Sequence, residues 1–196
     1  MTTESDQKAI SEIIEFWFAE ETKARWYDST KAFDELCRER FGELNAKAAA
    51  GDLGTWEETA KGALALCLLL DQMPRNLYRG TAQAFATDPK AVDVATLAIE
   101  RGFDQTLDLE KRKFLYLPFM HSERLADQER SVAISKALDD ENMLHYANDH
   151  ADIIRRFGRF PLRNAILGRE STPEEDAFLK AGAKSYGQSP ANDDQS

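Results

Sequence analysis

Three stretches of the sequence bring together side chains that could bind an anion or move a proton. The longest, residues 155–169, holds five arginines and no acidic residue in a chain whose net charge is −10 at pH 7. A guanidinium group is a planar set of donors that stays charged and fits a carboxylate or a phosphate. This stretch therefore predicts an anion site. The alternative is that the arginines pair with surplus acids and hold the C-terminal ends of helices.

The second stretch, residues 70–80, follows directly after the most apolar run of the chain, residues 63–70. It presents Asp71, two amide side chains and two arginines at the edge of the expected core. An unpaired buried carboxylate is costly, and Arg75, four residues later, is its nearest candidate partner in a helix. The pair could serve as a structural strut between helices or could form part of a pocket.

The third stretch surrounds His121 and Glu123. Helical spacing predicts one face shared by His121 and Gln128, and it places His150 among apolar positions of a later helix. We expect both histidines to be largely inaccessible and each to have a polar partner. Because a histidine changes charge nearest neutral pH, either could act as a general base, with Glu123 as the acid that orients it.

Helical periodicity runs through nearly the whole chain, and no segment shows the alternation typical of a strand. The predicted fold class is therefore all-α, with eight or nine short helices in antiparallel hairpins. We expect one domain over residues 1–184 and a polar, disordered tail over residues 185–196. The expected first residues or N-caps of helices after the first are Ser29, Thr59, Asp88, Asp108, Ser122, Glu141 and Thr172.

Glycine and proline residues predict where these helices end. Gly51 and Gly102 are each expected to end a helix, and a third helix should end at Gly158. Two further helices should end at or before Pro74 and Pro118. No clean internal repeat is present. Two short segments are similar to each other. The first is Arg-Asn at 75–76 followed by Arg79-Gly80, and the second is Arg-Asn at 163–164 followed by Gly168-Arg169.

The composition argues against several classes of partner. Acidic residues number 35 against 25 basic ones, so the chain repels phosphate backbones and anionic membrane surfaces, and we expect neither nucleic acid nor membrane as a partner. The longest apolar run is far shorter than the ~18 residues that span a bilayer. No secretory leader is recognisable, and Cys37 and Cys67 lie in apolar helical patterns without a paired motif. These features predict a cytoplasmic protein.

Motifs of the common enzyme classes are absent. The sequence contains no glycine-rich phosphate loop, nucleophile elbow or dinucleotide-binding fingerprint. Asp71, His121, Glu123 and His150 could ligate a metal, but their spacing matches no metal motif. We expect neither a metal nor a cofactor.

The segments Leu-Asp-Gln-Met-Pro-Arg-Asn (70–76), Leu-Pro-Phe-Met-His-Ser-Glu (117–123) and Arg-Phe-Gly-Arg-Phe-Pro-Leu-Arg-Asn (156–164) resemble a bacterial family known as domain of unknown function 924. The resemblance runs from about Ile13 to Leu179 and implies a fold similar to tetratricopeptide-like helical arrays, with no assigned activity. The family often has a histidine where this chain has Leu162. A mechanism that requires that histidine is therefore not implied here. The family's characteristic polar positions fall on Asp71, Gln72, Arg75, Asn76, Arg79, His121, Ser122, Glu123, Gln128, His150, Arg159, Arg163, Asn164 and Arg169.

The leading functional hypothesis is a helical binding domain with a polar pocket for an anionic small molecule or a peptide carboxylate. One alternative is an enzyme that uses the same pocket with His121 or His150 as general base. Another is a protein-interaction module in which the polar cluster is structural and the partner binds a concave helical surface. The ligand-binding residues of the leading hypothesis are Asp71, Gln72, Arg75, Asn76, Arg79, Gln128, Arg159, Arg163, Asn164 and Arg169.

Overall fold

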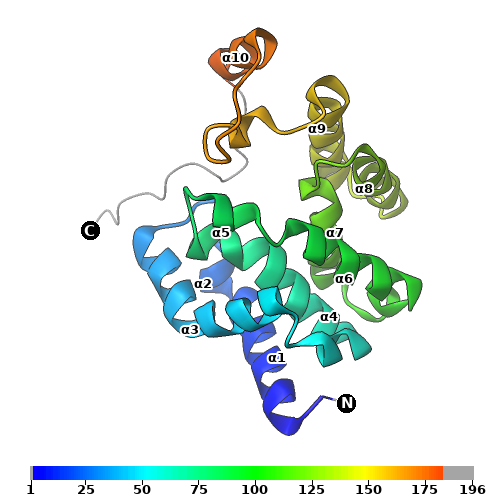
Figure 1. Ribbon diagram of the computed structural model, residues 1–196. Coiled ribbons are helices and arrows are strands. Elements are labelled where there is room, and N and C mark those ends of the chain that lie inside the picture. Colours follow the sequence, from blue (N-terminus) through cyan, green and yellow to red (C-terminus); the bar gives the residue numbers. More distant parts are fainter. Residues whose placement is uncertain (1, 183–196) are drawn as a thin grey trace. The chain divides into compact units, whose positions relative to one another are not determined.

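The computed structural model describes residues 2–182, and over these residues the elements are all helical (Figure 1). The predicted all-α fold class is therefore confirmed. The predicted tail, residues 185–196, lies outside the described residues. The α-helices are α1 (Glu4–Trp17), α2 (Glu20–Lys23), α3 (Lys31–Ala50), α4 (Ala60–Cys67), α5 (Met73–Leu77), α6 (Asp88–Glu100), α7 (Leu109–His121), α8 (Leu125–Ala137), α9 (Glu141–Phe157) and α10 (Pro173–Lys180).

Shorter helical turns connect several of these helices. A π-helix, Leu68–Gln72, joins α4 to α5. None of the described helices combines the length and the apolar character needed to cross a membrane. The 3-10 turns are Gly54–Glu58, Ala82–Phe85, Phe103–Thr106 and Pro161–Arg163.

The chain divides into two compact units, with unit 1 ending at Leu115 and unit 2 beginning at Tyr116. Unit 1 contains α1 to α6 and unit 2 contains α8 to α10, so the division falls within α7. Each unit is described by itself below. The single domain expected over residues 1–184 stays a prediction.

Unit 1 is built around α4. Residues 63–70, the apolar run, are each no more than 3% exposed. A segment that is apolar on every side must lie in the middle of its neighbours. Accordingly, α4 packs against both α1 and α6, and α3 packs against α5.

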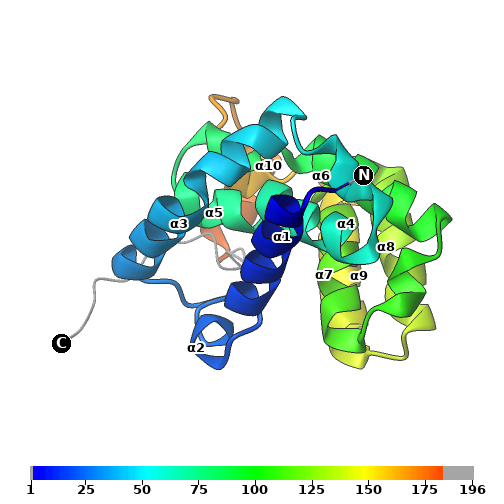
Figure 2. The same ribbon diagram turned by 90° about the horizontal axis from the view of Figure 1, so that it is seen from below.

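In unit 2, α8 and α9 form a hairpin and lie side by side in the views of Figure 1 and Figure 2. Asp140 caps α9 by accepting a hydrogen bond from the Met143 N–H (2.9 Å). Gly158 ends α9 at a φ of 70°, which glycine adopts without strain. The predicted capping box of Thr172 and Glu175 begins α10. These predicted helix ends are confirmed.

The two prolines do not end helices as predicted. Residues 60–77 remain helical, because the π-helix continues α4 into α5. In the turn before Pro74, the carbonyls of Leu69 and Leu70 accept from the side chains of Asn45 (2.7 Å) and Thr87 (2.6 Å). Pro118 lies inside α7, which continues to His121. The end of α7 is set by a tertiary contact, since the side-chain amide of Gln128 donates to the carbonyls of Met120 (2.7 Å) and Ser122 (2.6 Å).

Three predicted helix starts are also corrected. One is Ser122, since α8 begins at Leu125 with Arg124 as its N-cap residue. Thr30, rather than Ser29, caps α3 by accepting from the Phe33 N–H (3.2 Å). The Ser29 hydroxyl instead donates to the carboxylate of Asp34 (2.7 Å). Asp88 lies at the start of α6, but its carboxylate binds Arg75 rather than the helix backbone.

Gly62 in α4 is required by packing, and its replacement is our first prediction. A Cβ atom at Gly62 would lie 2.1 Å from the Trp56 carbonyl oxygen, so Gly62→Ala should destabilise the protein by about 1–3 kcal/mol. Gly42 in α3 is the matched control, because its Cβ would lie 3.9 Å from the nearest atom, in Arg38. Gly42→Ala should stabilise by about 0.4–1 kcal/mol. Urea unfolding measures both changes, and a Gly62→Ala protein as stable as wild type would contradict this packing.

Candidate functional site

The first predicted pair, Asp71 and Arg75, forms in unit 1 and includes a second acid. The Arg75 guanidinium contacts both oxygens of Asp88 (3.1 Å each) and one oxygen of Asp71 (3.5 Å). Asp71 is 0% exposed and Asp88 is 6% exposed. The Gln72 amide also donates to the Asp71 carboxylate. Arg75 thus holds two buried acids from the helical segment 60–77 and from α6.

A second cluster of unit 1 is centred on Asp34 of α3. Arg79 binds both oxygens of Asp34 (2.6 and 3.0 Å). The Asn76 amide donates to the same carboxylate (2.7 Å) and to the hydroxyl of Ser29 (3.1 Å). These contacts tie α5 and the residues just after it to the start of α3. They use the donors that the binding hypothesis assigned to a ligand.

Unit 2 repeats this arrangement around Glu175 of α10. Arg159 binds both oxygens of Glu175 (2.6 and 2.8 Å). The Asn164 amide donates to the same carboxylate (3.3 Å) and to the hydroxyl of Ser171 (3.1 Å). In each unit a Ser-Thr pair stands at the start of a helix. An acid in the first turns of that helix accepts hydrogen bonds from one asparagine amide and from two nitrogens of one arginine. Asn76 and Asn164, the asparagines of the two similar Arg-Asn segments, therefore have equivalent partners. The arginine equivalent to Arg79 is Arg159.

Glu175 is held as a carboxylate. The hydrogen bonds from Arg159 and from the Thr172 backbone N–H lower its pKa to about 2. The side chain is only 2% exposed. Glu175 thus combines two structural roles, the helix cap and the ion pair.

Glu123 engages a different arginine. Both oxygens of Glu123 contact the Arg169 guanidinium (2.7 and 3.0 Å), and one accepts from the Phe160 N–H (2.8 Å). Burial alone would raise the pKa of Glu123, but Arg169 and the Phe160 N–H lower it below its ordinary value. Arg169 also donates to the Asn164 side chain (3.0 Å). This carboxylate therefore fixes the loop that follows α9.

The two predicted histidines and Arg163 come together in unit 2. The rings of His121 and His150 have centroids 6.3 Å apart. Arg163 donates to the His121 carbonyl (3.0 Å) and lies 4.7 Å from the centre of the Phe160 ring, which also contacts His150 edge-on. His150 and Arg163 are each 6% exposed. His121 is only half-buried, so the predicted inaccessibility applies fully to His150 alone.

His150 is neutral at pH 7 in this environment. Its Nδ1 lies 2.8 Å from the Tyr146 carbonyl oxygen, which gives the expected polar partner. Burial, followed by the nearby His121 and also Arg163, lowers the pKa of His150 from 6.5 to about 4, against weaker opposing effects of the hydrogen bond to Tyr146 and of Asp149. A positive charge on this ring is therefore disfavoured by its surroundings.

The predicted helix face shared by His121 and Gln128 is wrong, because the chain turns between α7 and α8. The two residues are nevertheless close through the backbone. Gln128 donates to the carbonyls of Met120 and Ser122, and Arg163 donates to the carbonyl of His121 between them. Two side chains from different elements thus cap three consecutive carbonyls at the end of α7.

The predicted site residues therefore divide into two groups, one in each unit. Asp71, Gln72, Arg75, Asn76 and Arg79 lie in unit 1. The acids that bind the arginines were not predicted as partners, because they come from distant positions in the sequence. Glu175 had a signal, its capping box, but only for the cap. The predicted residues of unit 2 are His121, Glu123, Gln128, His150, Arg159, Arg163, Asn164 and Arg169.

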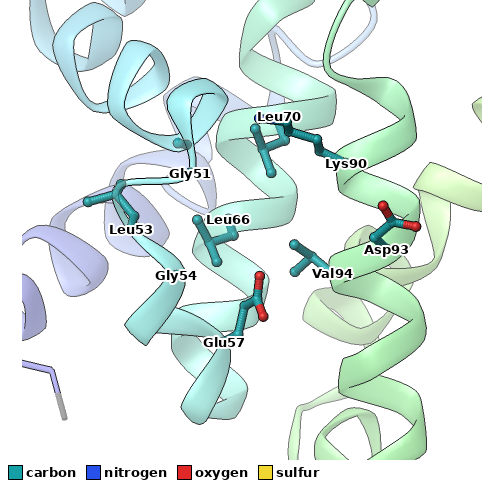
Figure 3. Close-up of a pocket in the computed structure, with 10 residues that line it drawn as sticks. Gly51, Leu53, Gly54, Glu57, Leu66, Leu70, Lys90, Asp93 and Val94 are labelled. Atoms are coloured by element: carbon teal, nitrogen blue, oxygen red, sulfur yellow. The ribbon is translucent and has the colours of Figure 1, made fainter.

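A shallow hollow of unit 1 involves none of these residues (Figure 3). Its volume is about 190 Å³, below the roughly 300–1,000 Å³ of small-molecule sites. Leu66 of α4 and Val94 of α6 face each other across it (Figure 3). The lining residues are Ala48, Gly51, Leu53, Gly54, Glu57, Leu66, Leu70, Lys90, Asp93 and Val94.

These contacts define an all-helical protein in which buried ion pairs connect helix ends. Over residues 13–183 the chain matches a family described as bacterial proteins of unknown function (DUF924), and it belongs to that family. It is similar to a solved structure of a protein of unknown function from Agrobacterium tumefaciens, with 45% identity and a TM-score of 0.85. That match covers 90% of this chain and 99% of the other. A comparison with curated proteins gave no match.

Proposed function

We propose that unit 2 binds a small ligand through a carboxylate or phosphate group, at a site formed by Arg163, His121 and His150. The observation that carries this proposal is the grouping of a buried guanidinium with two imidazoles around Phe160. Both His121 and Arg163 lower the pKa of His150. An oxyanion is the group that such a set of donors stabilises best.

The proposal assigns far fewer residues to the ligand than the sequence predicted for the pocket. Arg79, Arg159 and Arg169 each bind a carboxylate with two donors, and Arg75 binds Asp88 in the same way. These four arginines are therefore assigned to the structure rather than to a ligand. In unit 2 the Asn164 amide donates to Glu175 and Ser171, and the Gln128 amide donates to backbone carbonyls. Of the predicted ligand-binding set, the proposal therefore uses Arg163.

Binding of an anion would change the ionisation of His150. A bound negative charge opposes the effects of Arg163 and His121, so the pKa of His150 should rise from about 4 toward its ordinary 6.5. Binding then takes up a proton, and affinity increases as the pH falls from 7 to 5. At a pKa of about 4, His150 is a weak base at neutral pH, which argues against His150 as the general base of the enzyme alternative.

The pairing of the other arginines supports a second candidate, the interaction module. In that account all the polar clusters are structural, and a partner binds an exposed helical surface of a tetratricopeptide-like array. It predicts no response of the protein to small anions. The test below therefore separates the two candidates.

We also propose that the protein acts in the cytoplasm. Cys37 and Cys67 are buried free thiols, which suits a reducing compartment. Burial raises the pKa of Cys37 to about 12, and burial likewise raises that of Cys67. Neither thiol is suited to act as a nucleophile at neutral pH.

The second prediction concerns thermal stabilisation by inorganic phosphate, sulfate and acetate at pH 6. A ligand at ~100 times its dissociation constant adds roughly 2.7 kcal/mol to the stability of the native state. Arg163→Gln should abolish this effect. Arg163→Lys keeps the charge but loses the planar pair of donors, so it should retain a weaker response. Comparing phosphate with acetate identifies which oxyanion the site prefers.

Arg155→Gln is the control, because Arg155 lies near the end of α9 in an exposed pair with Asp152. Its response to anions should match that of wild type. If wild type gains no stability from any of the three anions, the binding proposal fails and the interaction module is favoured. Equal responses in wild type and Arg163→Gln would show that anions act elsewhere.

A further inference from the structure

The shallow hollow of unit 1 combines an apolar lining with charged residues (Figure 3). It lies among the end of α3 and the turn after it, the helical segment 60–77 and α6. Because its volume is only about 190 Å³, it suits a single aliphatic side chain better than a whole small molecule. The apolar lining residues, each no more than 8% exposed, are Ala48, Leu53, Leu66, Leu70 and Val94.

Negative charge gathers around this lining. Glu57 is half-buried, and its carboxylate points into the space between Leu66 and Val94 (Figure 3). Asp93 of α6 also lines the hollow and is exposed. The C-terminal end of α3, which Gly51 caps, adds the partial negative charge of its carbonyls. These groups together favour a cation.

Lys90 is the cation among the lining residues, and its ammonium group is already engaged. It donates to the Ala49 carbonyl in the last turn of α3, a position where a lysine commonly stabilises a helix end. By contrast, the carboxylates of Glu57 and Asp93 form no ion pair or hydrogen bond with the part of the chain that the structure describes. Both are therefore available to a cation from another molecule.

The turn Gly54–Glu58 holds Glu57 beside the hollow and leaves space next to it. Arg101 of α6 donates to the Glu57 carbonyl (2.6 Å) and fixes the turn. A Cβ atom at Gly54 would meet no atom within 4 Å, and Gly54 has no left-handed φ that would require a glycine. The hollow is thus open on the side of this turn.

We infer that this hollow is a docking site for one lysine side chain of a partner polypeptide. A lysine packs its four-carbon stem on apolar surface and keeps its ammonium group at the edge. Here the stem lies on Leu66 and Val94, and the ammonium pairs with Glu57 while Asp93 adds to the attraction. This docking is independent of the proposed anion site, whose residues lie in unit 2.

The third prediction uses a short peptide with blocked ends and a single lysine between glycines. A matched peptide carries norleucine, which has the same carbon stem without the ammonium group. In nuclear magnetic resonance titrations the lysine peptide should shift the methyl signals of Leu66 and Val94. Its dissociation constant should be about fivefold lower than that of the norleucine peptide, as expected for a partly exposed ion pair.

Two variants test the role of the carboxylates. Glu57→Gln keeps the shape of the side chain and the backbone contact with Arg101, so the protein should fold normally. It should reduce the preference for lysine, and adding Asp93→Asn should bring the ratio of the two dissociation constants close to one. Glu100→Gln is the control, because Glu100 is exposed on α6 and does not line the hollow. Its ratio should match that of wild type.

A lysine preference that Glu57→Gln weakens and Glu100→Gln keeps supports the inference. Equal binding of the lysine and norleucine peptides to wild type overturns it, and so does the lack of any shift at Leu66 and Val94. Free n-butylamine that binds as tightly as the lysine peptide would instead assign the hollow to a small amine and overturn the polypeptide partner. None of these outcomes affects the anion site, which the thermal test with phosphate, sulfate and acetate decides.

Discussion

Replacing Arg75 by methionine is expected to destabilise the native protein by about 3–5 kcal/mol, the largest effect of any single change considered. The guanidinium contacts Asp71 and Asp88, which are 0% and 6% exposed. Methionine fills part of the space but leaves both carboxylates without this positive partner. Chemical denaturation with urea measures the change in the free energy of unfolding.

A second substitution tests the cause. If the loss arises from the missing positive charge, adding Asp88→Asn to Arg75→Met should recover part of it, because an amide is cheaper to bury than a carboxylate that has lost its arginine. The control is Arg155→Met, which breaks the exposed pair with Asp152 (2.8 Å) and should change stability by less than about 1 kcal/mol. Similar losses for Arg75→Met and Arg155→Met would refute the structural role assigned to Arg75.

Replacing Glu175 by alanine is expected to cost about 2–4 kcal/mol, because it removes charge-assisted hydrogen bonds from Arg159 and the capping box of α10 together. The cost is smaller than at Arg75 because Arg159 has a side chain 28% exposed and can regain water. Urea unfolding at neutral pH measures this loss. Glu174→Ala is the neighbouring control, since Glu174 is 61% exposed and pairs with Arg156 at the surface.

The same residue predicts a pH dependence. The folded pKa of Glu175 is about 2 against an ordinary value of 4.5, so its charged form is stabilised by folding. Its contribution is therefore fully present above pH 4.5 and is lost as the pH falls toward 2. Glu175→Gln should flatten this part of the stability profile, whereas Glu174→Gln should not. Parallel profiles for wild type and Glu175→Gln between pH 5 and 2.5 would contradict the assignment.

Local chemistry in the sequence was enough to predict many of the helix ends and the core. Gly51 and Gly158 end helices in the left-handed conformation, Thr172 begins one with a capping box, and residues 63–70 are buried. Each of these features depends on neighbours within a few positions. The pair of Asp71 and Arg75, four residues apart, was predictable for the same reason.

The features that the sequence did not predict depend on contacts between distant segments. Asp34 meets Arg79 and Glu123 meets Arg169 across 45 and 46 positions. Pro118 stays inside α7 although a proline cannot donate to the preceding turn, and Gln128 of α8 caps the end of this helix. Spacing rules identify partners on one helix face, but they cannot identify which acid of another helix an arginine will meet.

The most direct test of the proposed anion site is the pKa of His150 in the presence and absence of sulfate, followed by nuclear magnetic resonance of the imidazole protons. Sulfate suits this test because its own charge is constant over the range from pH 4 to 7.5. His145, which has a side chain 58% exposed, provides an internal reference that should not respond to sulfate. Its position on α9 keeps the comparison within one helix.

The account predicts that saturating sulfate raises the pKa of His150 from about 4 toward 6.5 in wild type but leaves it unchanged in Arg163→Gln. The direction follows from placing a negative charge beside a ring that burial, His121 and Arg163 otherwise keep neutral. A His150 pKa that is the same with and without sulfate in wild type, up to concentrations that saturate any thermal response, would contradict the proposed site.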